Sequence, residues 1–307
     1  MKHPVVLALL ALLLSATTVA GASAPPGPFS TTGYTTAFQF TSLPSGYLQF
    51  HIQARGGPAY DDHALCLSMY GAPCEQLCAA AGGPCGVHGA FEGSFDFDEV
   101  GMGELSSLSG VNAGRLALLT DRGAAELHFG GQAASSGVSG NFAFLGGTEN
   151  LQRLAGVGAY AGSIGAIFRV DYQPCGRPDQ AACPRAQCVV RGAELRLLRS
   201  KALWTLANEG SQAARLESLL LHWPPQNGAL TAVYLGDQLL ASGYWPASWV
   251  ELDLGAASLA SRELHAGKSS ALTLEFERRG IDQTPASYSF LARFAPGCSA
   301  IHVLFPE

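Results

Sequence analysis

The first group of residues that could do chemistry is an acidic run of four within nine positions: Asp96, Asp98, Glu99 and Glu104. Carboxylates this close in sequence can bind a calcium ion or provide an acid and base pair. Asp96 and Asp98, however, alternate with Phe95 and Phe97, which places them on the opposite face of a strand. Carboxylates that point outward from a strand are usually only solvated. The pattern therefore favours a hydrated strand face over a metal or catalytic site.

Other residue types give no stronger signal for catalysis or for a cofactor. His51, His63, His88 and His128 are scattered, and no His-x-His or His-Glu-x2-His spacing occurs. No Gly-x-Ser-x-Gly elbow is present, although a dispersed triad is recognised only by its geometry. The glycines at 156, 158 and 162 approach a phosphate-binding spacing, but a strand pattern follows them where that chemistry needs a helix. We expect neither a metal nor a cofactor.

The eight cysteines are the clearest chemical feature of the chain, and we expect all of them to form disulfides: Cys66, Cys74, Cys78, Cys85, Cys175, Cys183, Cys188 and Cys298. An even number in two clusters plus one distant member is typical of an oxidising compartment. Zinc bound by the first four is the alternative, but the tight Cys-x2-Cys knuckles of zinc ribbons are missing. Our pairing hypothesis is two bridges inside 66–85, Cys175 with Cys183, and Cys188 with Cys298.

The first residues of the chain have the layout of a secretory signal peptide, which we assign to 1–22. Lys2 and His3 precede an apolar run from Pro4 to Leu14, and small residues follow as far as a cleavage site after Ala22. That run is too short to span a bilayer, and no later stretch approaches a transmembrane helix. We expect a secreted or cell-surface protein, and the lack of any N-x-Ser/Thr sequon is mild support for a bacterial source.

The remaining chain has the pattern of an all-β protein with two modules, at 30–173 and 188–307, joined by a linker at 174–187. In the first module short segments alternate apolar and polar residues, as in Leu48 to Gln53, and Gly-rich turns separate them. Six or more such strands in sequence predict a small antiparallel sheet that closes into a barrel, because closure removes unpaired edges. A Cys-rich insertion occupies 60–88, and it contains the one segment with a helical pattern, at 73–81.

Three runs in the first module resemble a known family. Gly140-Asn-Phe-Ala-Phe-Leu-Gly-Gly-Thr148, followed by the glycine-rich stretch 154–162 and by Phe168-Arg-Val-Asp-Tyr172, resembles the closing strands of allene oxide cyclase and dirigent-like barrels. The resemblance covers about 125 residues at most and implies an eight-stranded barrel whose interior can hold an apolar small molecule. Glu149 stands where that pattern often has glycine, and no catalytic residue of the family can be matched by position, so the resemblance does not imply cyclase activity.

The second module has the turn spacing of an immunoglobulin-like sandwich. Nine strand candidates lie between 194 and 305, separated by turns such as Pro225-Gln-Asn-Gly228. The pattern from Leu219 through Leu272-Thr-Leu-Glu-Phe-Glu to Gly297-Cys298 resembles a C-terminal sandwich of secreted bacterial surface proteins. That resemblance implies display or adhesion rather than chemistry.

Charge and aromatic residues limit the class of partner. Between 25 and 174 twelve acids and five arginines give a balance of −7, whereas between 175 and 307 twelve acids meet twelve bases. An acidic first module is poorly suited to nucleic acid, which selects basic patches. Candidate binding residues are Trp245 and Trp249, which could stack on sugars or fill a partner's pocket, and Phe95 and Phe97 on the apolar strand face. Core packing is the commoner fate of such tryptophans.

Two functional hypotheses follow. The one we favour is an exported, non-catalytic binding or surface protein whose barrel holds an apolar small molecule and whose sandwich attaches to a cell-surface or protein partner. The alternative is a barrel isomerase or cyclase that acts on a reactive apolar intermediate. An enzyme needs a polar group with a perturbed pKa inside an otherwise apolar barrel, so Glu92, Glu99 or His128 on the inside would favour the alternative.

Overall fold

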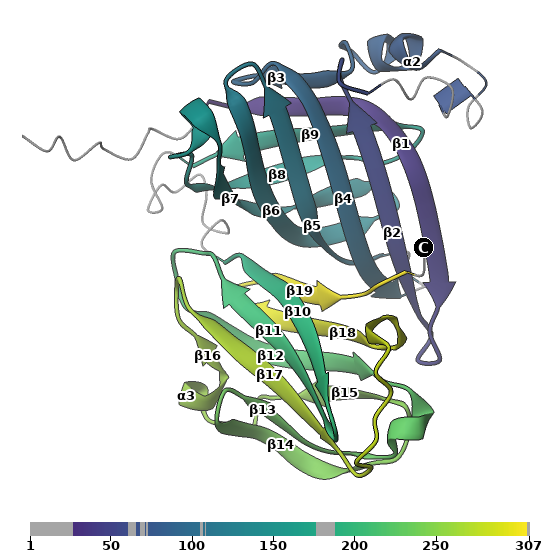
Figure 1. Ribbon diagram of the computed structural model, residues 1–307, viewed down its shortest axis with the longest axis vertical. Helices are drawn as coiled ribbons and strands as arrows, with labels where there is room; N and C mark the ends of the chain where they lie inside the picture. Colours follow the sequence, from purple (N-terminus) through teal and green to yellow (C-terminus); the bar gives the residue numbers. More distant parts are fainter. Residues whose placement is uncertain are drawn as a thin grey trace, which may run out of the picture.

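The structure is a computed structural model that describes residues 27–60, 66–67, 71, 73–104, 107, 109–175 and 188–305. The signal peptide assigned to 1–22, Cys183 and all of the linker except 174 and 175 lie outside the described residues. The described chain folds into one nine-stranded sheet and two five-stranded sheets, and all pairings between strands are antiparallel (Figure 1). The prediction of an all-β chain is confirmed.

The nine-stranded sheet contains the strands between residues 29 and 174: β1 (Phe29–Ser42), β2 (Tyr47–Gly56), β3 (Gly86–Gly89), β4 (Gly93–Glu104), β5 (Ser109–Thr120), β6 (Gly123–Ala134), β7 (Gly137–Gly147), β8 (Val157–Ser163) and β9 (Ile167–Pro174). β1 pairs with β2, β2 with β4, and each later strand with the next as far as β9, which pairs again with β1. The short strand β3 is an addition that pairs with β1 and β4. The last strand of the sheet thus pairs with its first strand, and we call the face that carries Phe95 and Phe97 the inner face.

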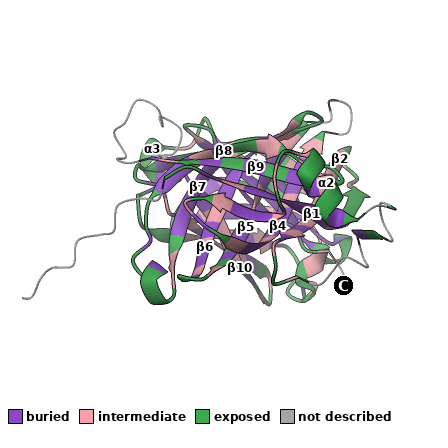
Figure 2. Ribbon diagram, turned by 90° about the horizontal axis from the view of Figure 1, so that it is seen from above, coloured by how far each residue is buried: buried purple, intermediate pink, exposed green. Residues whose placement is uncertain are grey.

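Large aromatic side chains fill one end of that inner face. Their rings pack closely, with the tilted ring of Phe168 centred 4.1 Å from that of Phe97 and 5.9 Å from that of Phe95. The buried members form one core cluster with the aliphatic residues of β5, β6 and β9. Figure 2 shows buried residues along the strands and exposed ones in the turns and in the helix α2 (Cys74–Ala80). That helix confirms the helical pattern at 73–81.

The two five-stranded sheets share a second apolar core. The first has the order β10-β11-β17-β13-β14, and the second has the order β15-β12-β18-β19 with β16 paired to β12. The bounds are β10 (Val190–Leu198), β11 (Lys201–Asn208), β12 (Ala214–His222), β13 (Leu230–Leu235), β14 (Gln238–Trp245), β15 (Trp249–Asp253), β16 (Glu263–Leu264), β17 (Ser269–Phe276), β18 (Ser289–Ala295) and β19 (Cys298–His302), with a one-turn helix α3 (Leu259–Arg262). Trp204 of one sheet and Phe290 of the other are fully buried in this core, with ring centroids 5.8 Å apart.

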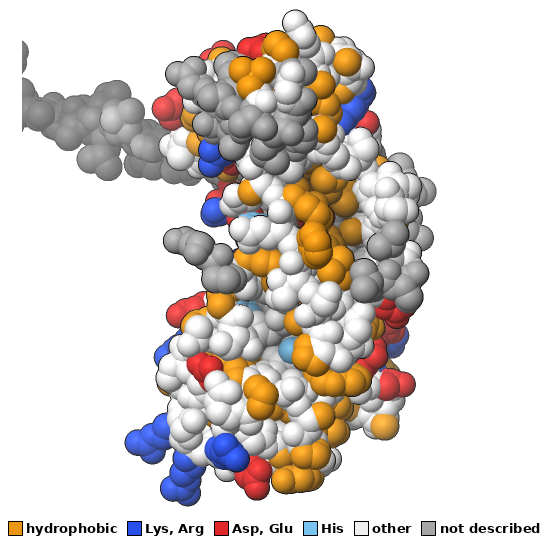
Figure 3. Space-filling model, turned by 90° about the vertical axis from the view of Figure 1, so that its right-hand side faces the viewer, with side chains coloured by type: hydrophobic (Ala, Val, Ile, Leu, Met, Phe, Trp, Pro, Cys, Tyr) orange, Lys and Arg blue, Asp and Glu red, His pale blue; other side chains and the backbone are white. Residues whose placement is uncertain are grey.

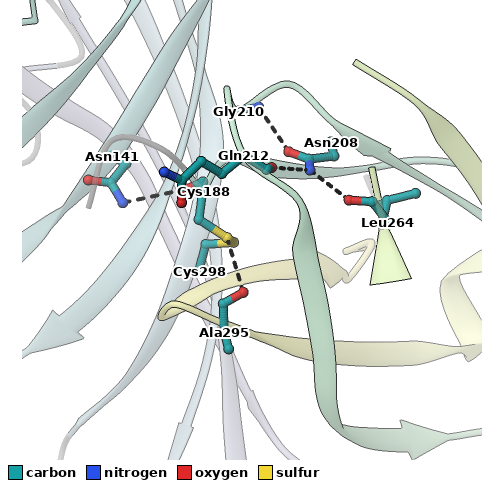
Figure 4. Close-up of a disulfide and its surroundings, with 8 residues drawn as sticks. All are labelled: Asn141, Cys188, Asn208, Gly210, Gln212, Leu264, Ala295 and Cys298. Carbon is teal, nitrogen blue, oxygen red and sulfur yellow. Dashed lines mark hydrogen bonds between the residues drawn. A yellow bond between two sulfur atoms is a disulfide. The ribbon is translucent and has the colours of Figure 1, made fainter. Parts of the chain in front are cut away.

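Three disulfides link described cysteines, and each agrees with the pairing hypothesis. Cys66 bonds to Cys74 and Cys78 bonds to Cys85, so both bridges lie inside the 66–85 cluster. Cys188 bonds to Cys298 across 110 positions of sequence (Figure 4). Cys175 is also disulfide-bonded, but the predicted pair Cys175 with Cys183 includes a residue outside the described chain. These bonds indicate an oxidising compartment.

The nine-stranded sheet and the second core are in direct contact. Met102 and Val111 on its outer face form one apolar cluster with Leu220, Leu291 and Ile301 of the β12, β18 and β19 strands. The buried hydroxyl of Ser289 donates a hydrogen bond of 2.8 Å to Oε1 of Gln49 on β2, and Figure 1 shows β19 facing the nine-stranded sheet. The apolar–polar alternation predicts that the outer-face residues of β2 and β4 are exposed to solvent. The second half of the chain in fact covers part of this face.

No helix in the described part of the chain has both the length and the apolar composition that crossing a membrane requires.

Candidate functional site

A cavity of about 280 Å³ opens on the inner face of the nine-stranded sheet, at the end opposite the aromatic cluster. We call it the inner cavity, and its lining consists of Phe38, Leu48, Phe50, Ile52, Glu99, Gly103, Glu104, Ser109, Gly110, Ala133, Ala134, Ser135, Gly137, Val138 and Ile164. Most of these side chains are apolar or small. Binding sites for small molecules are clefts of about 300 to 1,000 Å³ with apolar walls and few polar groups, so the inner cavity is at the small end of that class.

The sequence creates this cavity by changing residue size along the inner face. On β4 the inward positions run Phe95, Phe97, Glu99, Gly101 and Gly103, so bulky rings give way to residues without side chains. Gly103 pairs directly with Gly110, and a Cβ atom at Gly103 would lie 2.5 Å from the carbonyl oxygen of Ser109. Glycine is required there because the two strands approach too closely for a side chain.

Glu99 lies where the aromatic part of the inner face meets the inner cavity. Its side chain is fully buried, and Oε1 accepts a hydrogen bond of 2.7 Å from Nδ2 of Asn112 on β5. Asn112 in turn accepts a 3.1 Å hydrogen bond at Oδ1 from the hydroxyl of Tyr160, which reaches inward from β8. These three residues form a polar chain that crosses the inside of the sheet.

The second carboxyl oxygen of Glu99 is different, because it is buried and has no hydrogen-bond partner among the described residues. Since Oε1 already accepts from Asn112, a proton on this carboxyl belongs on Oε2, where it would be a free donor. Burial raises the pKa of Glu99 to about 8, although the hydrogen bond from Asn112 opposes that shift. Glu99 is therefore mainly protonated at neutral pH.

The two tyrosines near Glu99 remain neutral. Burial raises the pKa of Tyr160 and of Tyr172 above the ordinary tyrosine value, and the proximity of Glu99 adds to both shifts. Tyr160 packs edge to face on Phe129, with ring centroids 5.3 Å apart. Neither phenol can therefore serve as a base near neutral pH. Of Glu99, Asn112 and Tyr160, Glu99 is the residue that can exchange a proton.

The predicted binding residues lie elsewhere. Phe95 and Phe97 are 0% and 2% exposed and pack in the aromatic core, and neither is among the residues that line the inner cavity. Their rings fill the space that a ligand would need. Trp245 is partly buried and packs against the second core. Trp249 is 37% exposed and stacks on His222, with ring centroids 6.2 Å apart, and it is not among the residues that line the inner cavity.

The four acidic residues between 96 and 104 do not form one site. Asp96 and Asp98 lie on the outer face, where Asp96 pairs with Arg55 at 2.7 Å and Asp98 with His51 at 2.5 Å. Glu99 alone points inward, and Glu104 is exposed at the rim of the inner cavity. In the described residues no group of three or more His, Cys, Asp or Glu side chains could hold a metal ion.

Glu92, Glu99 and His128 are the residues whose position inside the sheet would favour an enzyme, and of these Glu99 lies on the inner face. Glu92 is exposed, and His128 lies on the outer face beside a second cavity of about 200 Å³ that residues of both halves line, including Arg191 and Ile301. Burial lowers the pKa of His128, whereas the Glu209 carboxylate 3.9 Å away opposes the shift. Sequence reasoning missed Asn112 and Tyr160, because the contact of Asn112 with Glu99 depends on the register of β4 and β5, and Tyr160 reaches Asn112 from β8.

Comparison of this chain with protein-family models, with curated proteins and with solved structures found no match.

Proposed function

We propose that the chain is an exported binding protein whose nine-stranded sheet is a closed barrel that holds an apolar small molecule in the inner cavity. The observation that carries the proposal is the inner cavity itself, a mainly apolar space whose described lining includes one buried carboxyl group, that of Glu99. A scaffold with no ligand would fill this space with side chains, as the aromatic cluster does at the other end of the same sheet.

The remaining parts of the proposal concern architecture and attachment. Pairing of β9 with β1 supports a closed barrel, and the runs that resemble allene oxide cyclase and dirigent-like proteins fall mainly on β7, β8 and β9. We further propose that the two five-stranded sheets are an immunoglobulin-like sandwich that attaches the protein to a surface or to a protein partner. Tyr244, 64% exposed, and Trp249 offer aromatic contact area for that role.

A second candidate function, a barrel isomerase or cyclase, is supported by Glu99. A carboxyl group with a pKa of about 8 holds a proton at neutral pH and can also release it. Such a group could give its proton to an oxygen atom of a bound apolar intermediate and take a proton back from carbon after the rearrangement, so that no net proton is consumed. Both the binding function and the isomerase or cyclase function require the ligand to bind, and only turnover of the ligand distinguishes them.

Binding of N-phenyl-1-naphthylamine, a neutral apolar dye whose fluorescence rises in apolar surroundings, tests the proposal. The wild-type protein should bind one dye per chain. Ala133→Leu, which adds three carbon atoms inside the inner cavity, should abolish binding, whereas Ser139→Leu, at an exposed position of β7 that does not line it, should leave binding unchanged. Equal dye binding by both variants would place the ligand elsewhere, and no binding by the wild type would remove the proposal.

Turnover can be tested on the same material. Glu99→Gln keeps the shape of the side chain and its hydrogen bond with Asn112 but cannot give up a proton. If the protein isomerises an apolar ligand that it binds, this variant should bind the ligand and leave it unchanged. Identical products from wild type and variant would exclude Glu99 as the catalytic residue.

A further inference from the structure

We propose that the inner cavity selects neutral, elongated apolar molecules that carry one hydrogen-bond-accepting oxygen. The oxygen of the ligand is bound by Oε2 of Glu99, and the alkyl chain of the ligand lies along β1. This inference rests on the proposed function, because it names the class of ligand that the same cavity would take.

The polar end of the ligand is defined by the carboxyl group of Glu99, which lines the inner cavity. Oε2 of Glu99 is buried without a partner among the described residues, while Oε1 is already engaged by Asn112 at 2.7 Å. A buried donor that lacks an acceptor costs about 1 to 3 kcal/mol. A ketone, ester, aldehyde or ether oxygen in the cavity would accept that hydrogen and remove the cost.

The charge of the ligand is limited by what surrounds it. None of the described residues that line the inner cavity is Lys, Arg or His, and its one other ionisable group is Glu104 at the rim. The titratable groups that face Glu99 from the other strands are Tyr160 and Tyr172, whose phenols remain neutral. A carboxylate ligand would lie unpaired in an apolar space beside acidic groups, which is strongly unfavourable. A fatty acid anion is therefore a poor fit.

The length of the ligand follows from the shape of β1. Its pairing with β9 ends at Tyr34, whereas its pairing with β2 continues as far as Ser42, so the second half of β1 extends past β9. Phe38 lines the inner cavity and Phe40 lies beside it, with ring centroids 6.0 Å apart, and they are 55% and 64% exposed. Figure 3, seen from the side where β1 lies in Figure 1, shows hydrophobic side chains gathered on this part of the molecule. They extend the apolar wall beyond the cavity and would cover an emerging alkyl chain.

Three ligands of equal chain length test the class: methyl octyl ketone, decane and decanoate, each competing with N-phenyl-1-naphthylamine. The ketone should bind about tenfold more tightly than the alkane, because it satisfies the Glu99 donor. Decanoate should bind at least about a hundredfold more weakly than the ketone. Phe38→Ala should weaken the ketone and the alkane by the same factor, since it removes only apolar contact.

Two Glu99 variants separate hydrogen bonding from shape. Glu99→Leu should lose the preference for the ketone over the alkane, whereas Glu99→Gln should keep it, because the amide nitrogen can donate in place of the carboxyl. Raising the pH through about 8 should weaken ketone binding by the wild type, as Glu99 ionises and loses its donor hydrogen, and should leave Glu99→Gln unchanged.

The outcomes also separate this inference from the proposed function. If the dye binds but the ketone shows no advantage over the alkane, or if decanoate binds as tightly as the ketone, the ligand class is wrong and the binding function stands. If neither the dye nor any of the three ligands binds, both proposals fail.

Discussion

The carboxyl group of Glu99 and the amide of Asn112 meet at 2.7 Å inside a sheet whose other inward side chains are mostly aromatic, aliphatic or absent. The contact satisfies one carboxyl oxygen and leaves the other without a partner among the described residues, on a side chain that lines the inner cavity. Burying a carboxyl group in this way is costly unless the group stays neutral. The pair therefore links the stability of the protein to the same proton that a ligand would contact.

Glu99 should make the protein less stable as pH rises. Its pKa is about 8 in the folded protein, above the ordinary value of 4.5, so between these values the unfolded chain holds fewer protons than the folded one. The free energy of unfolding should fall by on the order of 1 kcal/mol per pH unit in this window. Glu99→Gln should remove that dependence and be the more stable protein near pH 8, as measured by urea denaturation. Glu104→Gln, at an exposed acid on the same strand, is the control, and parallel curves for wild type and Glu99→Gln would contradict the account.

His222 should act in the opposite direction. Burial lowers its pKa to about 4 from 6.5, so below 6.5 the unfolded chain binds a proton that the folded protein does not. Stability should therefore be lost as pH falls from about 6.5 to about 4. His222→Gln should reduce that loss in denaturation curves, whereas His265→Gln, whose side chain is 73% exposed, should not. If His222→Gln lost as much stability as the wild type when the pH falls below 6.5, the His222 ring would have to be accessible to solvent.

The Cys188–Cys298 bond should contribute more to stability than the short bridges do. It closes a loop of 110 positions, against 7 for Cys78–Cys85, and the entropy lost by the unfolded chain grows with loop length. Replacing Cys188 and Cys298 by alanine should cost roughly 5 kcal/mol, and replacing Cys78 and Cys85 roughly 2 to 3 kcal/mol. Guanidinium denaturation of the two double variants measures the difference, and equal losses would argue against the loop-length explanation.

The contact between the two halves should couple their unfolding. Leu291 is fully buried and shares an apolar cluster with Met102 of β4. Leu291→Ala should cost about 2 to 4 kcal/mol and should also lower hydrogen-exchange protection in β4 and β5. Leu239→Ala, at a side chain that is 50% exposed, should cost less than about 1 kcal/mol. Protection that falls only beyond residue 188 would mean that the halves unfold independently.

The strands were predictable because one side of each is apolar. Alternation about Leu48 to Gln53 and Phe95 to Asp98 matches β2 and β4, and the cysteine clusters predicted the Cys188–Cys298 bond. The inner cavity was not predictable, because sequence cannot tell an apolar residue in a filled core, such as Phe95 or Phe97, from one beside a cavity.

The position of Glu99 was within reach of the same alternation. It follows Phe95 and Phe97 at intervals of two, so its side chain points to their face, but the acidic run was interpreted as one solvated face. Asn112 and Tyr160 were not predictable in this way. The contact of Asn112 with Glu99 depends on the register of β5, and the contact of Tyr160 with Asn112 depends on the approach of β8 across the inner face.

A crystal structure of the protein grown with methyl octyl ketone would test the central claim most directly. We predict electron density for one ketone in the inner cavity, with its oxygen at about 2.7 Å from Oε2 of Glu99 and its alkyl chain against Phe38. A cavity filled by the protein's own side chains, or a ketone bound only outside the nine-stranded sheet, would contradict the account.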